Sequence, residues 1–539
     1  PSSMVIRAAF SLPTPGACHS PYVLHVPSAT PAAPASDAAC ERAVDVLTGN
    51  ELEPIVELVI RSLGPDRYEA RAADGRVAFS REAEGAGWRF TVDEVDGRNP
   101  LDDQATDRFA PLESERSNQF PTRTENSYPF AFDTVAQLFD HASPPDLCVI
   151  HSSAHNWADQ GGHLGEHGSL DVVQARAPFI IGGAGVRRLG MIDRTCQLVD
   201  VAPTVLALLN AEPQPGIGRN GRPRDDCYLR RQDGDALEDL IDGGQDAPRH
   251  VIGFLFDGCN PNVLYDMAAR GEAPNVARIM AMGSTFAHGA MASLPTVTLA
   301  NHTGILTGCF PGHHGILHNA WYDRESRSQI ITNSNETWAT SMHFLDKGVD
   351  TIHSAVKRAL PGSVSVSINE PADAHADYST FDLLRRGVAM NRPPGADELP
   401  FATERFVRPV KEYRWSSRTD HTGVDQFNGI WGGSFHGVDY REPPTFTWCN
   451  FTLTDAAFHE GGPHSEIAYA SVHDTDARLG QVLDAVERRG AWDTTAFFIV
   501  ADHGMEESNP EVTGDWGPVL ERAGVDFRDE AYGFLYLEG

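Results

Sequence analysis

Two short stretches of the chain are continuously apolar and rich in β-prone residues. They cover residues 250–256 and 496–501, and polar residues follow each of them at once. Unbroken apolar runs of this length indicate strands that are buried on both faces, as in a parallel sheet. Gly258 and Asn260-Pro261 then interrupt the first stretch before a helical pattern begins. We therefore predict an α/β fold, with a mostly parallel sheet sandwiched by helices.

The first 128 residues have a different pattern, typical of a separate N-terminal region. Residues 1–40 are rich in Pro, Ala and Ser, which indicates an irregular arm on the surface. Residues 51–101 alternate apolar and polar positions around Gly turns, of which Asp74-Gly75 is the strongest hairpin signal. Residues 102–128 are polar, which favours a loop. We predict an arm followed by a small α+β unit.

Acidic residues and histidines follow the predicted buried strands. Asp257 ends the first strand, and Asp502 and His503 follow the second. Asp455 and His459 come after a third apolar run, and their spacing of four places both on one face of a helix. Open α/β sheets bind ligands at the carboxyl ends of their strands. Because carboxylate and imidazole together suit zinc or another divalent ion, we predict a metal site at this edge.

A hydroxyl group lies at the start of another predicted helix. Thr298, in PTVTLANH (residues 295–302), precedes a helical pattern that continues to Thr307. The N–H groups and dipole at a helix N-terminus favour an anion, so a phosphate could bind against Thr298. Each feature alone has a structural alternative, since such Asp and Thr residues often only cap helices. The combination and order of the motifs carry the prediction.

Charge limits the classes of partner. The formal net charge is −32, which argues against nucleic-acid polymers and anionic membranes, because clustered Lys and Arg bind phosphate backbones. A small phosphate ester is compatible with this charge, since bound metal ions would dominate the local field. No run of eighteen apolar residues predicts a membrane span. No signal peptide is visible, so we expect a cytoplasmic protein, or a periplasmic or secreted one if a leader was removed. The oligomeric state is not determined by the sequence.

The cysteines do not form a recognisable ligand or disulfide pattern. The eight cysteines include no C-x-x-C pair. We expect most of them, Cys259 included, to be buried small apolar residues.

The polar motifs together resemble a known family. The resemblance is to the nucleotide pyrophosphatase/phosphodiesterase-like branch of the alkaline phosphatase superfamily, and it covers residues 250 to about 510 in the family order. It rests on Asp257, PTVTLANH with Thr298, Asp455-x-x-x-His459 followed by Gly462-Pro463, and Asp502-His503-Gly504-Met505. The resemblance implies a hydrolase that cleaves phosphodiester or pyrophosphate bonds of a small molecule.

The same resemblance implies a site with two zinc ions. One ion would be held by Asp257, Thr298, Asp502 and His503, and the other by Asp455 and His459. Thr298 would be the covalent nucleophile, forming a phosphothreonine intermediate. Asn319 falls where the family keeps an asparagine that hydrogen-bonds the phosphoryl oxygens.

One expected ligand is absent from its usual place. In the family a further metal-binding histidine follows the Asp-His-Gly motif, but this chain has no histidine after His503. Residues 129–210 contain a strand, a His-rich loop, a second strand and a helix, an order that resembles the back end of the family fold. In that loop His167 matches the missing ligand best and His163 is the fallback, while Glu166 could accept a hydrogen bond from the ligand.

The upstream position of this matching segment suggests that the parts of the catalytic domain follow one another in a different order from that of the family. We predict that residues 129–210 complete a catalytic domain formed by residues 249–539, with residues 211–248 as a linker and a cap insertion at about 325–446. The rival hypothesis is that residues 40–210 are a degenerate second copy, because Ser153-Ala154-His155 resembles a strand end whose Asp has become Ala154.

The substrate is less closely defined. Leu299 stands where nucleotide-cleaving members often carry an aromatic ring that stacks on the base. Phosphonoacetate hydrolase and phosphomonoesterase are therefore alternatives. An inactive binding module with the same fold is a second alternative.

Overall fold

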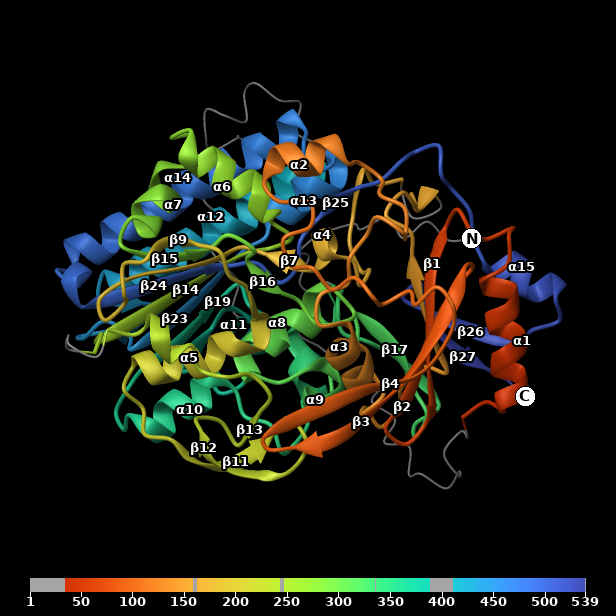
Figure 1. Ribbon diagram of the computed structural model, residues 1–539. Helices are drawn as coiled ribbons and strands as arrows, with labels where there is room; N and C mark the ends of the chain where they lie inside the picture. The colour runs from red at the N-terminus through yellow and green to blue at the C-terminus, as the bar shows by residue number, and fades with distance from the viewer. Residues whose placement is uncertain (1–33, 159–161, 243–246, 335, 388–410, 539) are drawn as a thin grey trace, which may run out of the picture.

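The computed structural model describes residues 34–158, 162–242, 247–334, 336–387 and 411–538. Two large sheets dominate the described chain, one on each side of the view in Figure 1. The eight-stranded sheet lies among helices on the left, and the seven-stranded sheet lies on the right with both ends of the described chain.

The eight-stranded sheet carries the buried strands that the apolar runs predict. Its order is β20 (Tyr378–Ser379), β19 (Ser365–Ile368), β23 (Phe446–Phe451), β14 (His250–Phe256), β24 (Thr495–Val500), β8 (Phe179–Gly183), β15 (Gly283–Phe286) and β9 (Gly190–Ile192). Every residue of β23, β14 and β24 is buried. Only β8 runs antiparallel to its neighbours. The predicted α/β fold with a mostly parallel sheet is confirmed.

Helices cover both faces of this sheet (Figure 1). One layer contains α6 (Pro261–Ala269), α7 (Pro274–Met280), α12 (Lys411–Trp431), α13 (Leu453–Gly461) and α14 (Glu466–Arg488). The opposite layer contains α5 (Val201–Leu208), α8 (Thr298–Thr307) and α10 (Ile352–Ala359). The apolar side chains of strands and helices form one continuous core. This rigid support fixes the strand ends from which the polar motifs emerge.

Segments that are far apart in sequence supply neighbouring strands. β8, from residues 129–210, pairs with β24 along five residues, from Ala496 opposite Gly183 to Val500 opposite Phe179. β15, which follows α7, pairs with the other side of β8. The upstream segment therefore lies inside the sheet, between strands of the downstream half.

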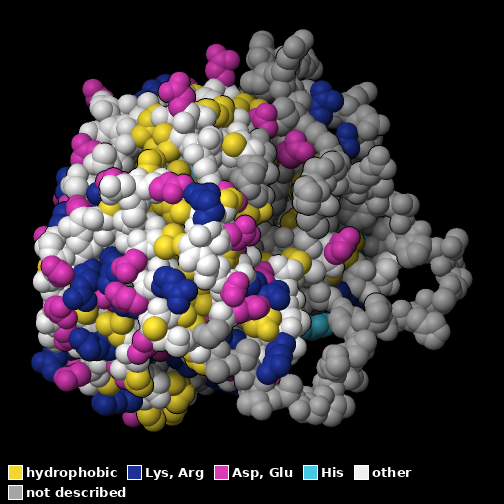
Figure 2. All heavy atoms as spheres, turned by 90° about the vertical axis from the view of Figure 1, so that its right-hand side faces the viewer, with side chains coloured by type: hydrophobic (Ala, Val, Ile, Leu, Met, Phe, Trp, Pro, Cys, Tyr) yellow, Lys and Arg dark blue, Asp and Glu magenta, His cyan; other side chains and the backbone are white. Residues whose placement is uncertain are grey.

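The seven-stranded sheet is antiparallel throughout. Its order is β26 (Phe527–Glu530), β27 (Phe534–Leu537), β5 (Leu147–His151), β1 (Val56–Gly64), β2 (Arg67–Ala72), β3 (Gly75–Glu84) and β4 (Gly87–Gly97). Helices α1 (Asp37–Leu47) and α15 (Gly517–Arg522) pack beside each other on this side of the molecule. Figure 2 shows this face, on which acidic and basic side chains are intermixed.

Three regions differ from the sequence-based expectation. The arm predicted for residues 1–40 is helical from Asp37, because Ser36 caps α1 through Ala39 N–H; residues 1–33 lie outside the described chain. Residues 102–128 contain the short helix α2 (Leu112–Ser117). The predicted linker, residues 211–248, contains a three-stranded sheet of β11 (Gln214–Gly218), β12 (Pro223–Cys227) and β13 (Arg231–Gln232). Gly216 and Gly218 lie in β11, and Asp225 and Asp226 lie in β12, so this polar stretch forms a folded unit.

The expected cap is also partly integrated into the core. Strands β19 and β20 of residues 325–446 pair within the eight-stranded sheet. The rest includes β18 (Ser328–Ile331), η4 (Trp338–Phe344), α11 (Thr380–Arg385) and the hairpin β21 (Ser434–Phe435) with β22 (Val438–Asp439). Strand β18 pairs with β17 (Ala320–Asp323), which lies just before this region. Part of the region expected to form a cap therefore belongs to the eight-stranded sheet itself.

The structure also shows the surroundings of the cysteines and the character of the helices. The seven described cysteines are buried and free of disulfides, and Cys259 is fully buried. None of the described helices is long and apolar enough to cross a membrane.

Candidate metal centre

Three adjacent strands bring the predicted acidic residues to one edge of the sheet. Asp257 follows β14, Asp502 follows β24, and α13 carries Asp455 just after β23. Gly258 has a φ of +61°, and a Cβ at this position would lie 2.7 Å from Asp455 Oδ1. The glycine therefore allows Asp455 to approach the loop after β14 closely.

Several polar atoms at this edge are buried and have no hydrogen-bond partner. They are Asp257 Oδ1, Asp455 Oδ1, Asp502 Oδ2, His302 Nε2 and His503 Nε2. Four sets of three described residues have ligand atoms within 4.8 Å of one another: His167, Asp455 and His459; Asp257, Asp455 and His503; Asp257, His302 and Asp502; and His163, Glu166 and His459. Buried polar atoms are normally paired, so this convergence fits bound cations.

The charges of the site also favour a cation. Burial and the negative charge of Asp502 raise the pKa of Asp257 to about 8. Burial opposes protonation of His503, yet Asp502 raises the pKa of this imidazole to about 9. Carboxylates crowded together in a buried place repel each other, and a divalent ion between them removes that repulsion.

The histidines are oriented as metal ligands usually are. Nδ1 of His459 bonds the carbonyl of Gly165 at 2.7 Å, and Nδ1 of His503 bonds that of Gly504 at 2.8 Å. A carbonyl only accepts hydrogen bonds, so Nδ1 carries a proton in each ring and Nε2 is the nitrogen that remains for a metal ion. This arrangement fixes the tautomer that binds a metal through Nε2.

The structure brings His167 to the same place. Its ring stacks on that of His503 with centroids 3.7 Å apart, and lies 5.0 Å from the ring of His459. Burial, together with the neighbouring His503 and His459, holds the pKa of His167 well below its usual range. The imidazole is therefore neutral, as a metal ligand must be.

Glu166 does not orient His167, contrary to the expectation from sequence. Nδ1 of His167 bonds the carbonyl of Thr296 at 2.8 Å. Thr296 also accepts a hydrogen bond from Gly168 N–H and donates one to Ser169 O. The segment just before Thr298 therefore orients His167.

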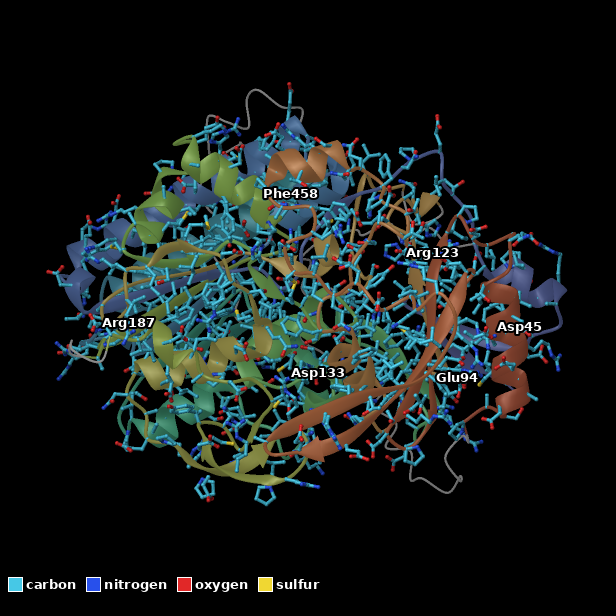
Figure 3. All side chains as sticks on the ribbon, viewed as in Figure 1. Asp45, Glu94, Arg123, Asp133, Arg187 and Phe458 are labelled. Carbon is cyan, nitrogen blue, oxygen red and sulfur yellow. The ribbon has the colours of Figure 1, made fainter. Side chains whose placement is uncertain are left out.

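The loop before His167 is attached to α13. Leu164 N–H donates to the carbonyl of His459 at 2.8 Å, and a Cβ on Gly165 would lie 2.3 Å from the carbonyl of Phe458. Figure 3 labels Phe458 on α13, among the helices beside the large sheet. The strand β6 (Gly165–Glu166) also pairs with β25 (Glu506–Glu507). Backbone contacts from both sides thus place the upstream loop at the site.

Thr298 is the first residue of α8, as predicted. Within residues 289–314 it is the only residue that is not buried. Asn319 lies beside it, because its side-chain oxygen accepts a hydrogen bond from Leu299 N–H at 3.2 Å. An anion at the N-terminus of α8 would meet both side chains.

The fallback ligand His163 and a further histidine of the downstream half, His464, lie in different surroundings. His163 has its ring 4.8 Å from that of His459, and burial with the charge of His459 lowers its pKa to about 4. His464 uses both nitrogens elsewhere, Nε2 with Glu115 at 3.0 Å and Nδ1 with Glu507 at 3.1 Å. Of the two, only His163 belongs to a set of candidate ligands.

His302 is a residue of the site that was not predicted from sequence, although it lies inside PTVTLANH. His302 is four residues after Thr298 in α8, the same spacing that drew attention to Asp455 and His459. The spacing of four from Thr298 is therefore the sequence feature that could have identified His302 as a residue of the site. Leu299, by contrast, is fully buried in the apolar cluster beneath the seven-stranded sheet, so it offers no surface to a ligand.

Comparison with known proteins gives the relatives of the chain. It is 23% identical over 266 residues to ectonucleotide pyrophosphatase/phosphodiesterase 1 of Saccharomyces cerevisiae, covering 46% of this chain and 32% of the relative. It is 23% identical over 266 residues to family member 3 of Mus musculus, covering 48% and 25%. Alkaline phosphatase PafA of Elizabethkingia meningoseptica is 32% identical over 90 residues, covering 17% and 16%. The chain thus spans a third or less of the length of these relatives.

The downstream half of the chain matches a model of a whole protein family. Residues 251–537, more than half of the chain, match the family described as type I phosphodiesterase / nucleotide pyrophosphatase. The matched region contains α8 with Thr298, the acidic strand ends and α13. The chain belongs to the type I phosphodiesterase / nucleotide pyrophosphatase family.

Proposed function

We propose that the chain is a metal-dependent hydrolase of small-molecule phosphate esters, acting on phosphodiester or pyrophosphate bonds. One observation carries the proposal: unpartnered carboxylate and imidazole atoms converge in a buried place at the edge of the sheet that also carries Thr298. Family membership supports the reaction class. The acidic surface does not oppose it, since the substrate is small.

Two divalent ions, which we propose to be zinc, fit the residues present. Asp257, Thr298, Asp502 and His503 would hold one ion, and Asp455, His459 and His167 the other. When bound, such a pair of ions stabilises the negative charge that develops on attacking and leaving oxygens. Three protein ligands and an open position are usual for a catalytic zinc, and His167 supplies the third ligand that Asp455 and His459 lack.

Thr298 is the proposed nucleophile. Its hydroxyl releases its proton to solvent and the oxygen attacks phosphorus in line, so an Oγ–P bond forms, the P–O bond to the leaving group breaks, and the leaving oxygen takes up a proton from solvent. Water then cleaves the phosphothreonine, which releases the phosphate product and restores the hydroxyl. Asn319 would donate its side-chain N–H to a phosphoryl oxygen while its oxygen stays bonded to Leu299 N–H. The N-terminus of α8 adds partial positive charge at the same point.

Substitution of the nucleophile tests the mechanism. Thr298→Ala should lower turnover by about three orders of magnitude or more, because the covalent step is lost. Metal content by atomic emission should stay near that of the wild type. Thr303→Ser, on the same helix but bonded to Leu299 O, is the matched control and should retain activity. Near wild-type turnover of Thr298→Ala would remove Thr298 from the mechanism.

A phosphomonoesterase is the second candidate. Two observations favour it. The identity to an alkaline phosphatase is 32%, although over only 90 residues. Leu299 is a buried aliphatic residue, so no aromatic ring is present there to stack on a base. A side-by-side assay of bis-p-nitrophenyl phosphate, p-nitrophenyl phosphate and phosphonoacetate decides between the classes. We expect the diester to be cleaved fastest. If it is the poorest substrate, the phosphodiesterase proposal fails, and no turnover of any of the three would favour the binding module.

A further inference from the structure

A buried histidine faces the carboxylates of the site but is not among the residues proposed above to hold the two ions. His302 is inaccessible to solvent, and its Nε2 lies 3.5 Å from Asp257 Oδ2 and 3.4 Å from Asp502 Oδ2. The geometry of these contacts is too poor for regular hydrogen bonds, and Nε2 has no other partner. The ring therefore touches two carboxylates that come from neighbouring strands, β14 and β24.

The other side of the ring is anchored firmly. Nδ1 of His302 lies 2.8 and 3.0 Å from the two carboxylate oxygens of Glu370. Glu370 is itself inaccessible to solvent and accepts hydrogen bonds from Ala372 N–H at 2.8 Å and Trp448 Nε1–H at 3.2 Å. Trp448 belongs to the central strand β23. The pair is thus tied to the body of the sheet, so the position of the imidazole is fixed.

We propose that Glu370 and His302 are a positioning pair that holds Asp257 and Asp502 in the pose in which they bind a divalent ion. This inference rests on the proposed function, since it concerns the same metal centre. The like-charged carboxylates tend to separate, and the fixed imidazole in contact with both limits that movement. Groups that orient metal ligands in this way commonly change metal affinity by about 10- to 100-fold when they are altered.

Two substitutions of His302 separate positioning from simple packing. The side-chain amide of glutamine reaches roughly as far as Nε2, whereas that of asparagine reaches only as far as Nδ1. His302→Gln therefore keeps a group facing Asp257 and Asp502, while His302→Asn keeps only the contact with Glu370. We expect His302→Asn to weaken binding of one ion by about 10- to 100-fold and His302→Gln to restore most of that loss.

The experiment measures metal binding by the full-length protein, independently of activity. The protein is stripped with a chelator, its fold is checked by circular dichroism, and Zn²⁺ is titrated against a chromophoric chelator. Glu370→Gln should lower the affinity for one ion and leave the other unchanged. Asp373→Asn, a buried carboxylate on the same loop that bonds Arg385, is the matched control and should bind both ions as the wild type does.

Co²⁺ spectra test the role more closely. As a positioning residue, His302 can be replaced by Gln without changing the visible band of bound Co²⁺ at saturation. A changed band would mean that His302 is itself a ligand and would overturn the proposal. Wild-type affinity for both ions in His302→Asn and Glu370→Gln would overturn it as well. Failure of the proposed function looks different: the wild type would bind two ions yet hydrolyse no phosphate ester.

Discussion

The two large sheets each place histidines after a buried strand, but in opposite surroundings. After β24, Asp502 and His503 face two further carboxylates, Asp257 and Asp455. After β5, His155 lies against Trp157 with ring centroids 4.3 Å apart, and Trp157 lies 5.1 Å from Trp516. All candidate metal clusters in the described part of the chain lie at the first sheet. Carboxylates from adjacent strands, more than imidazoles, distinguish the candidate site.

The second sheet nevertheless has a part in the site. Strand β5 leads into the loop that carries His167, and the C-terminal strand β27 pairs with β5. Residues 40–210 are divided between the sheets, with β1 to β5 in the antiparallel one and β8 and β9 in the parallel one. A degenerate second copy of the domain would form a parallel sheet of its own, so this division argues against that hypothesis and supports the rearranged assembly.

Removal of the upstream half of the chain should have the largest effect. Residues 245–539 expressed alone should be insoluble or inactive, because β24 and β15 would lose the strand β8 between them and the site would lose His167. Solubility, circular dichroism and diester turnover measure the result, with the full chain as control. An isolated half that folds and hydrolyses diesters at the full rate would make residues 1–210 an appended region.

Substitution of the upstream histidine should have the next largest effect. His167→Ala should cost one bound metal ion and most of the activity, because Asp455 and His459 alone are two ligands. Metal content and turnover check this. His163→Ala, in the same loop, is the matched control and should keep both ions. Two ions retained by His167→Ala with loss of one in His163→Ala would reverse the assignment.

A pH-dependent effect is expected where the two halves meet at His464. Burial opposes its charge, but hydrogen bonds to Glu115 and Glu507 raise its pKa to about 9. Because the folded pKa lies above the unfolded value near 6.5, this stabilisation is complete below about pH 6.5 and is lost as pH rises through 9. His464→Gln should therefore lower the free energy of unfolding by about 1–2 kcal/mol at pH 6 and by less at pH 9.5.

Urea unfolding at the two pH values measures that difference. His473→Gln, on α14 with a more distant carboxylate at 3.7 Å, is a suitable control and should show a smaller change. An equal loss for His464→Gln at both pH values would mean that the charge of His464 does not contribute.

The smallest effect is predicted for a substitution that introduces a carboxylate at position 154, after strand β5. Ala154→Asp recreates the acidic position before His155, but none of the candidate ligand clusters in the described chain includes a residue of this strand end. We expect metal content to remain that of the wild type in equilibrium dialysis. A third bound ion would show that the second sheet retains a latent site.

Local sequence determined the parts of the site that are encoded within about ten residues. The apolar runs identified β14 and β24, and the polar residues just after them are Asp257, Asp502 and His503. The spacing of four identified Asp455 and His459 on α13, and the position before a helical pattern identified Thr298. These features follow from strand and helix periodicity, which neighbouring residues set.

Only the tertiary structure decided how the separate segments meet. Which strand lies beside β24, whether Thr296 or Glu166 orients His167, and whether Glu370 reaches His302 depend on pairings across tens to hundreds of residues. The same holds for β19 and for β11 to β13, whose short and polar segments resemble loops until partners satisfy their backbone groups. Periodicity records which face of an element is buried but not which element covers it, because many partners bury the same apolar area equally well.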